Sequence, residues 1–261
     1  MYAAQSRRGD ELEQLQVIAG LDPGRPERQV AVALAHLRWS ADPLVPASRR
    51  TGHADLAVLT LSSALERTPD HPLVYAALGR VWLDIARTRN DPAALNKAIE
   101  ALEHVGSTND ATSESLMLYG QALLQAGQIE LAERTLEQAT ERYPVEPPAF
   151  VLYARAADQQ HHWEAARQAW LQYGALVGDD RDFLPRAEHI AELSLHVNDT
   201  ATAIEWLARA NAASADARLV ELLAEAQLKG GDRPAAAATV ARGLDKYPTD
   251  AALVALSRRL R

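Results

Sequence analysis

The hydrophobic pattern of the chain is clearest between residues 113 and 144, which predict two consecutive amphipathic helices. Within each helix the apolar residues recur every three or four positions, which places them on one face of an α-helix. Gly127 and Gln128 interrupt the pattern, and Pro144 ends the second helix. The two apolar stripes are therefore expected to pack against each other across a tight turn. They consist of Leu116, Tyr119, Gly120 and Leu123 in the first helix, and Ile129, Ala132, Leu136 and Ala139 in the second.

The same two-helix pattern recurs along most of the chain, with small residues and turn-breaking residues at matching places. Ala224 and Pro248, for example, are separated by as many residues as Gly120 and Pro144. The pattern predicts an all-α chain of about six helix pairs, with a partial pair or a single helix before them and a capping helix after them. The expected pairs cover 28–69, 72–110, 113–146, 147–180, 184–216 and 217–250, and the flanking segments are 1–27 and 251–261.

Two of the pairs are longer than the others because of insertions between their helices. The sequence predicts loops at residues 41–52 and 87–91, and a first helix that starts near Gly9. Equivalent loops of a repeat array lie on the same side. We therefore expect both loops at one edge, where their arginines would form a basic patch. Its members are Arg49, Arg50, Arg87 and Arg89.

These features resemble the tetratricopeptide repeat, a helix pair that recurs about every 34 residues. The resemblance covers nearly the whole chain, and it departs from the family pattern at the two insertions and in the weak copy at 184–216. It implies a single right-handed α-solenoid over residues 1–261, in which the first helices line a concave groove and the second helices form the convex surface. Two alternatives are open for Met1: it begins the natural chain, or further repeats precede it.

Composition and charge exclude several classes of protein. The chain has a formal net charge of −8, whereas a protein that binds nucleic acid needs a basic face. The same charge argues against the RNA-reading pentatricopeptide repeats, which have a similar period. The chain has no Cys, which excludes disulfides, thiolate metal sites and thiol catalysis. No apolar run reaches the ~20 residues of a membrane span, and the N-terminus lacks the apolar region of a signal peptide.

Groove positions follow from aligning the first helices with the family pattern. Side chains of these helices that avoid the packing stripe are expected to face a protein or peptide partner. Ala76 and Met117 stand where chaperone-binding members of the family place a lysine, so a clamp for a C-terminal carboxylate is not expected. The predicted groove residues are Arg80, Gln121, Arg155, Asp158, Glu188, His189, Glu192, His196, Glu221 and Glu225.

The predicted groove residues are unevenly charged along the chain. Arg80 and Arg155 come from the earlier helices, whereas the glutamates concentrate in the last two pairs. The groove is therefore expected to be basic to neutral at one end and acidic at the other. A bound segment would then place its basic residues against Glu192 and Glu225.

Three of these residues are also acceptable zinc ligands, because His189, Glu192 and His196 follow one another at i, i+3 and i+7 on one helix. A zinc site also needs a fourth ligand and supporting hydrogen bonds, so a polar face toward the groove is the preferred interpretation. The sequence contains no phosphate-binding loop, no GxSxG motif and no HExxH motif. We therefore expect no catalytic residue, no metal and no cofactor.

The tryptophans are expected to be structural. Trp82, Trp163 and Trp170 fall at positions where the family packs large side chains between helices, and we expect them in the core. Truncating one of them to Ala is expected to cost ~3–5 kcal/mol. Trp206 lies beside the apolar stripe of its helix and is expected to be exposed and available for contact.

The sequence thus predicts a non-enzymatic adaptor that binds a protein or peptide segment in its groove. One alternative is a regulatory or substrate-presenting region cut from a larger enzyme, or from a subunit of a secretion or assembly machine. Another is a self-assembling scaffold. The partner and the oligomeric state stay open. For the compartment, cytoplasm is the default and periplasm is the alternative if the chain is a fragment of an exported protein.

Overall fold

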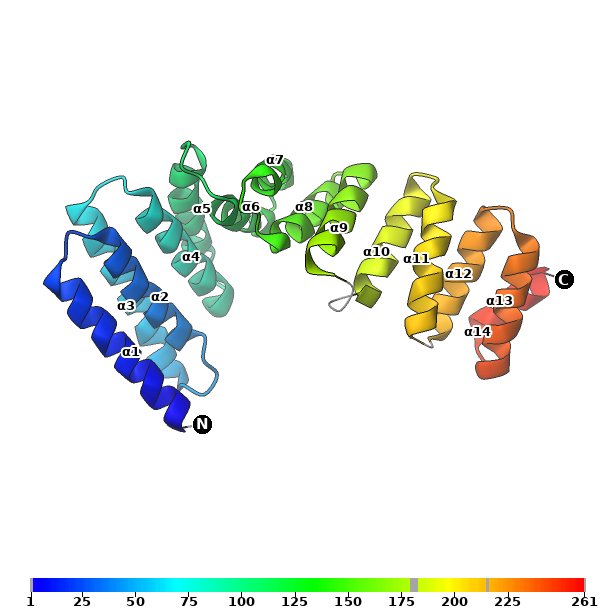
Figure 1. Cartoon of the computed structure of the whole chain (residues 1–261), viewed down its shortest axis with the longest axis horizontal. Coiled ribbons are helices and arrows are strands. Elements are labelled where there is room, and N and C mark those ends of the chain that lie inside the picture. Colours follow the sequence, from blue (N-terminus) through cyan, green and yellow to red (C-terminus); the bar gives the residue numbers. More distant parts are fainter. Residues whose placement is uncertain (1, 179–182, 215, 261) are drawn as a thin grey trace. The chain divides into compact units, whose positions relative to one another are not determined.

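The computed structural model describes residues 2–178, 183–214 and 216–260, and every regular element in these ranges is an α-helix (Figure 1). In chain order the helices form six pairs between a first and a last single helix, which confirms the predicted all-α helical repeat. The helices are α1 (Tyr2–Leu21), α2 (Pro26–Ser40), α3 (Ala47–Arg67), α4 (Pro72–Arg89), α5 (Pro92–Gly106), α6 (Ser113–Gln125), α7 (Ile129–Glu141), α8 (Pro147–Gln159), α9 (Trp163–Val177), α10 (Phe183–His196), α11 (Thr200–Ala213), α12 (Ala217–Lys229), α13 (Arg233–Lys246) and α14 (Ala251–Leu260).

The chain forms two compact units, which are called unit 1 (residues 1–149) and unit 2 (residues 150–261) below. The core of unit 1 includes Leu61 and Val81, which are fully buried where the α2–α3 and α4–α5 pairs meet. The core of unit 2 includes Leu207 and Leu219, which join α11 to α12. Each core is thus spread along its row of helix pairs. The predicted single solenoid over residues 1–261 stays a prediction.

Glycine sets the contact between the two helices of a pair in unit 1. A Cβ atom on Gly120 would lie 2.3 Å from Cγ of Leu136, and one on Gly79 would lie 2.3 Å from Cγ of Leu102. Carbon atoms cannot approach so closely, so the leucine of the second helix lies against the bare backbone of the first. This contact confirms the predicted packing of the helix pair at 113–144.

Two segments that were predicted as loops are helical in part, because residues 47–52 and 87–89 belong to helices. Helix α3 begins at Ala47, and helix α4 continues to Arg89. Helix α4 ends at Asn90, whose φ of 51° is the left-handed conformation that commonly terminates helices. The insertions therefore lengthen α3 and α4, and residues 41–46 stay a loop. The first helix is also longer than predicted, because α1 begins at Tyr2 rather than near Gly9.

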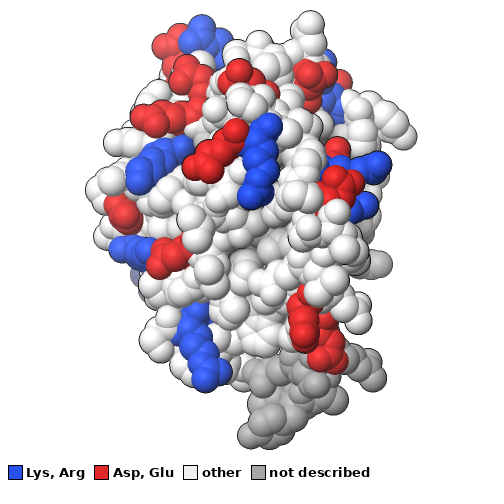
Figure 2. Space-filling view, turned by 90° about the vertical axis from the view of Figure 1, so that its left-hand side faces the viewer, with Lys and Arg blue, Asp and Glu red and all other residues white. Residues whose placement is uncertain are grey.

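The two lengthened helix ends lie together, as predicted, because Arg89 at the end of α4 reaches α3. Its guanidinium donates to the Thr51 carbonyl oxygen at 3.2 Å and pairs with the Asp55 carboxylate at 2.8 Å. Arg87 pairs with Asp84 at 2.6 Å. The expected basic patch is therefore wrong in part, since carboxylates partner two of its four arginines. Figure 2 likewise shows acidic and basic side chains interspersed over the end of unit 1 that carries α1.

The tryptophans differ from the prediction in their burial. Trp82, Trp163 and Trp170 are half-buried rather than in the core, and Trp206 is half-buried rather than exposed. Each keeps part of a ring face available to a polar neighbour. The ammonium of Lys97 lies 4.4 Å from the ring of Trp82, which is the geometry of a cation–π contact. For Trp82, Trp163 and Trp170 the stripe position therefore predicted the correct side of the helix but too deep a burial.

Candidate functional site

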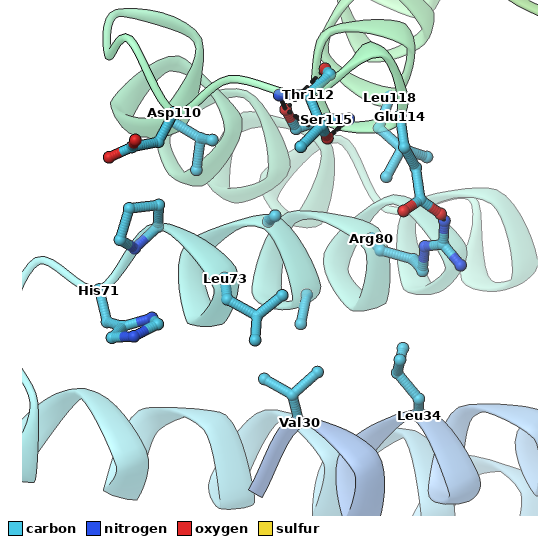
Figure 3. Close-up of a pocket in the computed structure, with 14 residues that line it drawn as sticks. Val30, Leu34, His71, Leu73, Arg80, Asp110, Thr112, Glu114, Ser115 and Leu118 are labelled. Atoms are coloured by element: carbon cyan, nitrogen blue, oxygen red, sulfur yellow. Dashed lines mark hydrogen bonds and ion pairs between the residues drawn. The ribbon is translucent and has the colours of Figure 1, made fainter. Parts of the chain in front are cut away.

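A pocket of about 360 Å³ lies in unit 1 along α2, α4 and α6, the first helices of three successive pairs (Figure 3). Its walls are mainly apolar. Val30 and Leu34 of α2 point toward Leu73 of α4, and Leu118 of α6 closes another side. Because each of these side chains comes from a first helix, the pocket occupies the side of the repeats on which the groove was predicted.

The local sequence of α4 explains why this wall is apolar. Leu73, Ala76, Ala77 and Arg80 follow one another at i, i+3, i+4 and i+7, so they share one helix face. This face is separate from the stripe that packs against α5. Leu73 is 42% exposed, so part of this apolar face is open at the pocket. A second apolar stripe on a first helix is the sequence signal that would have located the pocket.

The charged residues at the pocket of unit 1 are largely satisfied. Arg80 forms an ion pair with Glu114, the residue that α6 contributes at this end of the pocket. Thr112 and Ser115 are used by the capping box that begins α6. Within the described residues Asp110 has no ion-pair partner. The pocket therefore offers apolar surface first, with one unpaired carboxylate at its rim.

The two predicted groove residues of unit 1 differ in their position relative to the pocket. Arg80 lines the pocket, but its charge is compensated, so it does not make this region basic. Gln121 does not line the pocket and is half-buried on α6. The apolar members of the pocket were not predicted, because only polar side chains were expected on the groove face. They are Val30, Leu34 and Leu73.

Unit 2 has a different pocket, of about 170 Å³, and five predicted groove residues meet around it. Arg155 and Asp158 come from α8, and His189, Glu192 and His196 come from α10. Two helical spacings bring them together: i, i+3 on α8, and i, i+3, i+7 on α10. The prediction from spacing therefore grouped residues that do lie side by side.

Two parallel stacks of rings join α9 to α10 at this pocket. The ring centroids of Trp170 and His189 are 5.1 Å apart with planes 10° from parallel, and those of Trp163 and His196 are 4.3 Å apart with planes at 23°. Both tryptophans and both histidines are seven positions apart on their helices, so the pairs repeat every two turns. We call this arrangement the tryptophan–histidine ladder. It holds both imidazoles against indole faces at the edge of the pocket.

The zinc interpretation gains no support from this geometry. Among the residues that the structure describes, no three His, Cys, Asp or Glu side chains are grouped as metal ligands. His189 and His196 are two helical turns apart, and each ring is held against a different tryptophan. Glu192 lies between them along α10. These groups are therefore arranged as separate contacts on one wall.

An ion-pair cluster behind the pocket fixes α9 to the start of α11. Arg167 of α9 contacts the Asp199 carboxylate at 2.5 Å and the Glu164 carboxylate at 2.9 Å. Hydrogen bonds from Thr202, followed by the bond from Arg167, lower the pKa of Asp199. Hydrogen bonds from Arg167 and Gln168 lower the pKa of Glu164. The ionised cluster thus positions the helix that carries both tryptophans of the ladder.

The charges around the pocket of unit 2 are not compensated within the described residues. Arg155, Asp158 and Glu192 are exposed, and none of them has an ion-pair partner there. Among the other predicted groove residues, Glu188 pairs with Arg218 at 3.7 Å. The remaining two belong to α12 and do not line the pocket: Glu221 is half-buried, and Glu225 is exposed.

Comparison with known families identifies the repeat. Residues 118–179 match the family model of the tetratricopeptide repeat. Residues 118–179 are therefore assigned to the tetratricopeptide repeat. The match includes most of α6 and extends through α7, α8 and α9, so these two tetratricopeptide pairs hold the glycine contact of Gly120 and also Trp163 and Trp170 of the ladder.

A curated relative and several solved structures are similar to these tetratricopeptide repeats. The Vi polysaccharide export protein VexE of Salmonella typhi is 31% identical over 116 residues, which are 44% of this chain but 17% of that protein. The chain thus spans a small part of that relative's length. Pseudomonas aeruginosa pilF has a TM-score of 0.55 at 19% identity, covering 92% of this chain and 99% of its own. YrrB, a TPR protein with an unusual peptide-binding site, has a TM-score of 0.58 at 13% identity, covering 80% and 96%. At these identities the solved structures show the fold.

Proteins built from tetratricopeptide repeats are interaction scaffolds, and this chain shares their architecture.

No helix in the described part of the chain is long and apolar enough to cross a membrane. The candidate site is therefore a pair of pockets on one scaffold, one apolar in unit 1 and one polar in unit 2.

Proposed function

We propose that the chain is a non-catalytic adaptor that binds an extended or helical segment of a partner protein, and that the apolar pocket of unit 1 receives the main anchoring side chains. The observation that carries the proposal is the pocket itself. First helices of three successive repeats supply its walls, and Leu73 is 42% exposed there. Covering this exposed leucine with a partner removes apolar surface from water, which favours binding.

The size of the pocket fits side chains of a protein segment. At about 360 Å³ it lies near the lower end of the ~300–1,000 Å³ range of ligand pockets. It is about twice the ~150 Å³ of a cavity that holds a benzene molecule, so it has room for one aromatic or two aliphatic side chains. Burying one such side chain contributes about 1.5–3 kcal/mol.

The charges at the pocket rim suggest the composition of the segment. Arg80 and Glu114 neutralise each other at one end, so they impose little charge preference. Asp110 is exposed at the pocket and unpaired within the described residues. A segment with a large apolar residue followed or preceded by a basic residue would therefore match both the wall and the rim. Such contacts near solvent contribute ~0.2–1 kcal/mol each and weaken with salt.

A peptide-display selection tests the adaptor function. Random peptides are selected on the wild-type chain, and the enriched clones are measured against Leu73→Asp and Leu59→Asp variants. Leu59 is the matched control, because it is also an exposed leucine of unit 1, at 61%, and it lies outside the pocket. We expect clones with a large apolar residue that lose binding to Leu73→Asp and keep it with Leu59→Asp. Clones that bind both variants equally well would contradict the proposal.

A role in an export or assembly machine is a second candidate, and the similarity to VexE favours it. That relative is named as a polysaccharide export protein, and 44% of this chain aligns with part of it. Within such a machine the repeats would hold another protein subunit. The reading frame on both sides of these 261 residues tests the idea. A frame that continues into another domain supports it, whereas a frame that closes at both ends would leave the adaptor as an independent protein.

A further inference from the structure

We propose that the pocket of unit 2 is a separate subsite for one basic side chain of a partner protein. The subsite presupposes the adaptor function proposed above, because the basic side chain belongs to a bound segment. Its chemistry is opposite to that of the apolar pocket. It would give the adaptor a second position that selects a cationic residue, in addition to Asp110 at the rim of the apolar pocket.

The dimensions of the pocket limit its occupant to the end of one side chain. Its volume is about 170 Å³, close to the ~150 Å³ that accommodates one benzene molecule. Ala154 and Leu193 supply small apolar surfaces, and Trp170 supplies a broad one. The methylene stem of a lysine or an arginine can pack on such surfaces while its charged end stays near water.

The charges of the pocket favour a cation over an anion. Asp158 on α8 and Glu192 on α10 present carboxylates from two different helices, and Arg155 presents one guanidinium. An arriving cation therefore meets two opposite charges and one like charge. An arriving carboxylate meets two like charges and one opposite charge. None of the three has an ion-pair partner within the described residues, so no existing pair has to be broken.

The tryptophan–histidine ladder adds rigid hydrogen-bonding groups to the same wall. His189 and His196 both line the pocket, and each imidazole is stacked on an indole. Stacking limits the rotation of these rings, so less side-chain entropy is lost when a ligand binds. A neutral imidazole offers one acceptor nitrogen, and a basic side chain supplies only donors. The wall of α10 therefore complements a cation both in charge and in hydrogen-bonding capacity.

A titration with small probes tests the subsite directly. The probes are Nα-acetyl-arginine amide and Nα-acetyl-citrulline amide, which have nearly the same shape but differ in charge. Binding is followed at pH 7.5 by the NMR signals of the five indole N–H groups of the full chain. We expect the arginine probe to shift the signal of Trp170 in a saturable manner that weakens with salt, and the citrulline probe to shift it little. Trp39 and Trp82 in unit 1 are internal controls.

Substitutions give the charge dependence. We expect Asp158→Asn and Glu192→Gln each to weaken binding of the arginine probe about twofold to fivefold, the range of exposed charge contacts. Arg155→Gln should strengthen it by a similar factor. Glu225→Gln is the matched control, because this exposed glutamate lies on α12 outside the pocket, and it should change nothing. All four side chains are exposed, so the fold should persist in each variant.

Several outcomes would overturn the subsite. Equal shifts with the arginine and citrulline probes would do so, as would weaker binding in Arg155→Gln or preferential binding of Nα-acetyl-glutamate amide. These results are separable from those of the peptide selection. If Leu73-dependent peptides are found but the arginine probe fails, only the basic subsite is lost. If the probe saturates Trp170 but no peptide depends on Leu73, the apolar anchor is lost instead.

Discussion

Each of units 1 and 2 has a pocket lined by side chains of first helices, yet the two pockets have opposite chemistry. In unit 1 the wall is apolar, and Arg80 is paired with Glu114. In unit 2 charged and imidazole side chains surround the pocket, and Arg155 has no ion-pair partner within the described residues. The comparison shows that the packing of a helix pair and the chemistry of its exposed face are set by different positions. One scaffold can therefore carry two unlike subsites.

The units also differ in how their helix pairs touch. In unit 1, Gly79 and Gly120 let a leucine of the second helix reach the backbone of the first. In unit 2 the position that corresponds to Gly120 is occupied by Ala224, which is fully buried in a cluster with Val240. In that pair Val240 stands where the pair of Gly120 has Leu136, whereas the α10–α11 pair combines Ala191 with Leu207. Unit 2 thus accommodates a Cβ atom at this position in both pairs.

The largest expected difference between the units is the loss of stability in acid, because unit 1 holds buried His36 of α2 against half-buried His53 of α3. Nδ1 of His36 lies 2.9 Å from Nδ1 of His53, and burial followed by repulsion from His53 lowers the pKa of His36 to about 4. The unfolded chain binds this proton near pH 6.5 and the folded chain only near pH 4. Stability is therefore complete above about pH 6.5 and falls by up to ~3 kcal/mol as the pH approaches 4.

Hydrogen exchange of the full chain between pH 7 and pH 4, corrected for the intrinsic rate, measures this effect. We expect α2 and α3 to lose protection in acid, and a His36→Gln variant to lose less of it over the same interval. His53 belongs to the same pair, and burial followed by repulsion from Arg49 lowers its pKa as well. Equal acid sensitivity in the wild type and in His36→Gln would contradict the assignment.

Overpacking the glycine contact should have the next largest effect. In Gly120→Leu the new side chain must occupy the space of Leu136, which should lower the free energy of unfolding by ~1–3 kcal/mol. Gly52→Ala is the control, because a Cβ atom there meets nothing within 4 Å on the exposed side of α3. That substitution should stabilise the chain by about 0.5–1 kcal/mol. Denaturant melts of both variants check the pair, and an unchanged midpoint in Gly120→Leu would refute the register.

The tryptophan–histidine ladder of unit 2 should show measurable coupling. A double-mutant cycle of Trp170→Leu and His189→Leu isolates the stacked pair from the burial of each ring. We expect a coupling free energy of about 0.5–1.5 kcal/mol, the value of a well-oriented ring pair. The Tyr75–His104 pair in unit 1, with centroids 4.0 Å apart and planes at 32°, is the comparison. A coupling free energy near zero for Trp170 and His189 would mean that the two rings lie close together without stabilising each other.

The smallest expected effect distinguishes the two arginines. Arg80→Gln removes an exposed ion pair with Glu114 and should cost ~0.2–1 kcal/mol, less at high salt. Arg155→Gln removes a guanidinium with no ion-pair partner among the described residues, so its free energy of unfolding should stay within ~0.5 kcal/mol of the wild type. Thermal melts at low and high ionic strength measure both. A larger loss in Arg155→Gln would show that its charge is already used within the chain.

The sequence by itself determined the all-α repeat and the contact inside the 113–144 pair. Leu116, Gly120 and Leu136 specify their register through helical periodicity and side-chain size alone, which are local properties. The same reasoning grouped His189, Glu192 and His196, because residues three to seven apart on one helix must share a face. It failed at Ala47 and Arg89, where a segment compatible with both loop and helix became helix. Contacts such as that between Arg89 and Asp55 stabilise the helical form, and no local pattern records them.

Only the tertiary structure decided what surrounds each candidate residue. Arg80 and Arg155 are equivalent in the sequence pattern, yet Glu114 from the following repeat neutralises Arg80, whereas no described residue forms an ion pair with Arg155. The apolar pocket required Val30 and Leu73, from different repeats, to face the same space. The half-burial of Trp170 likewise depends on its stack with His189. Periodicity fixes which face of a helix a residue occupies, but its neighbours across that face come from other helices, and their positions depend on how the helix pairs stack.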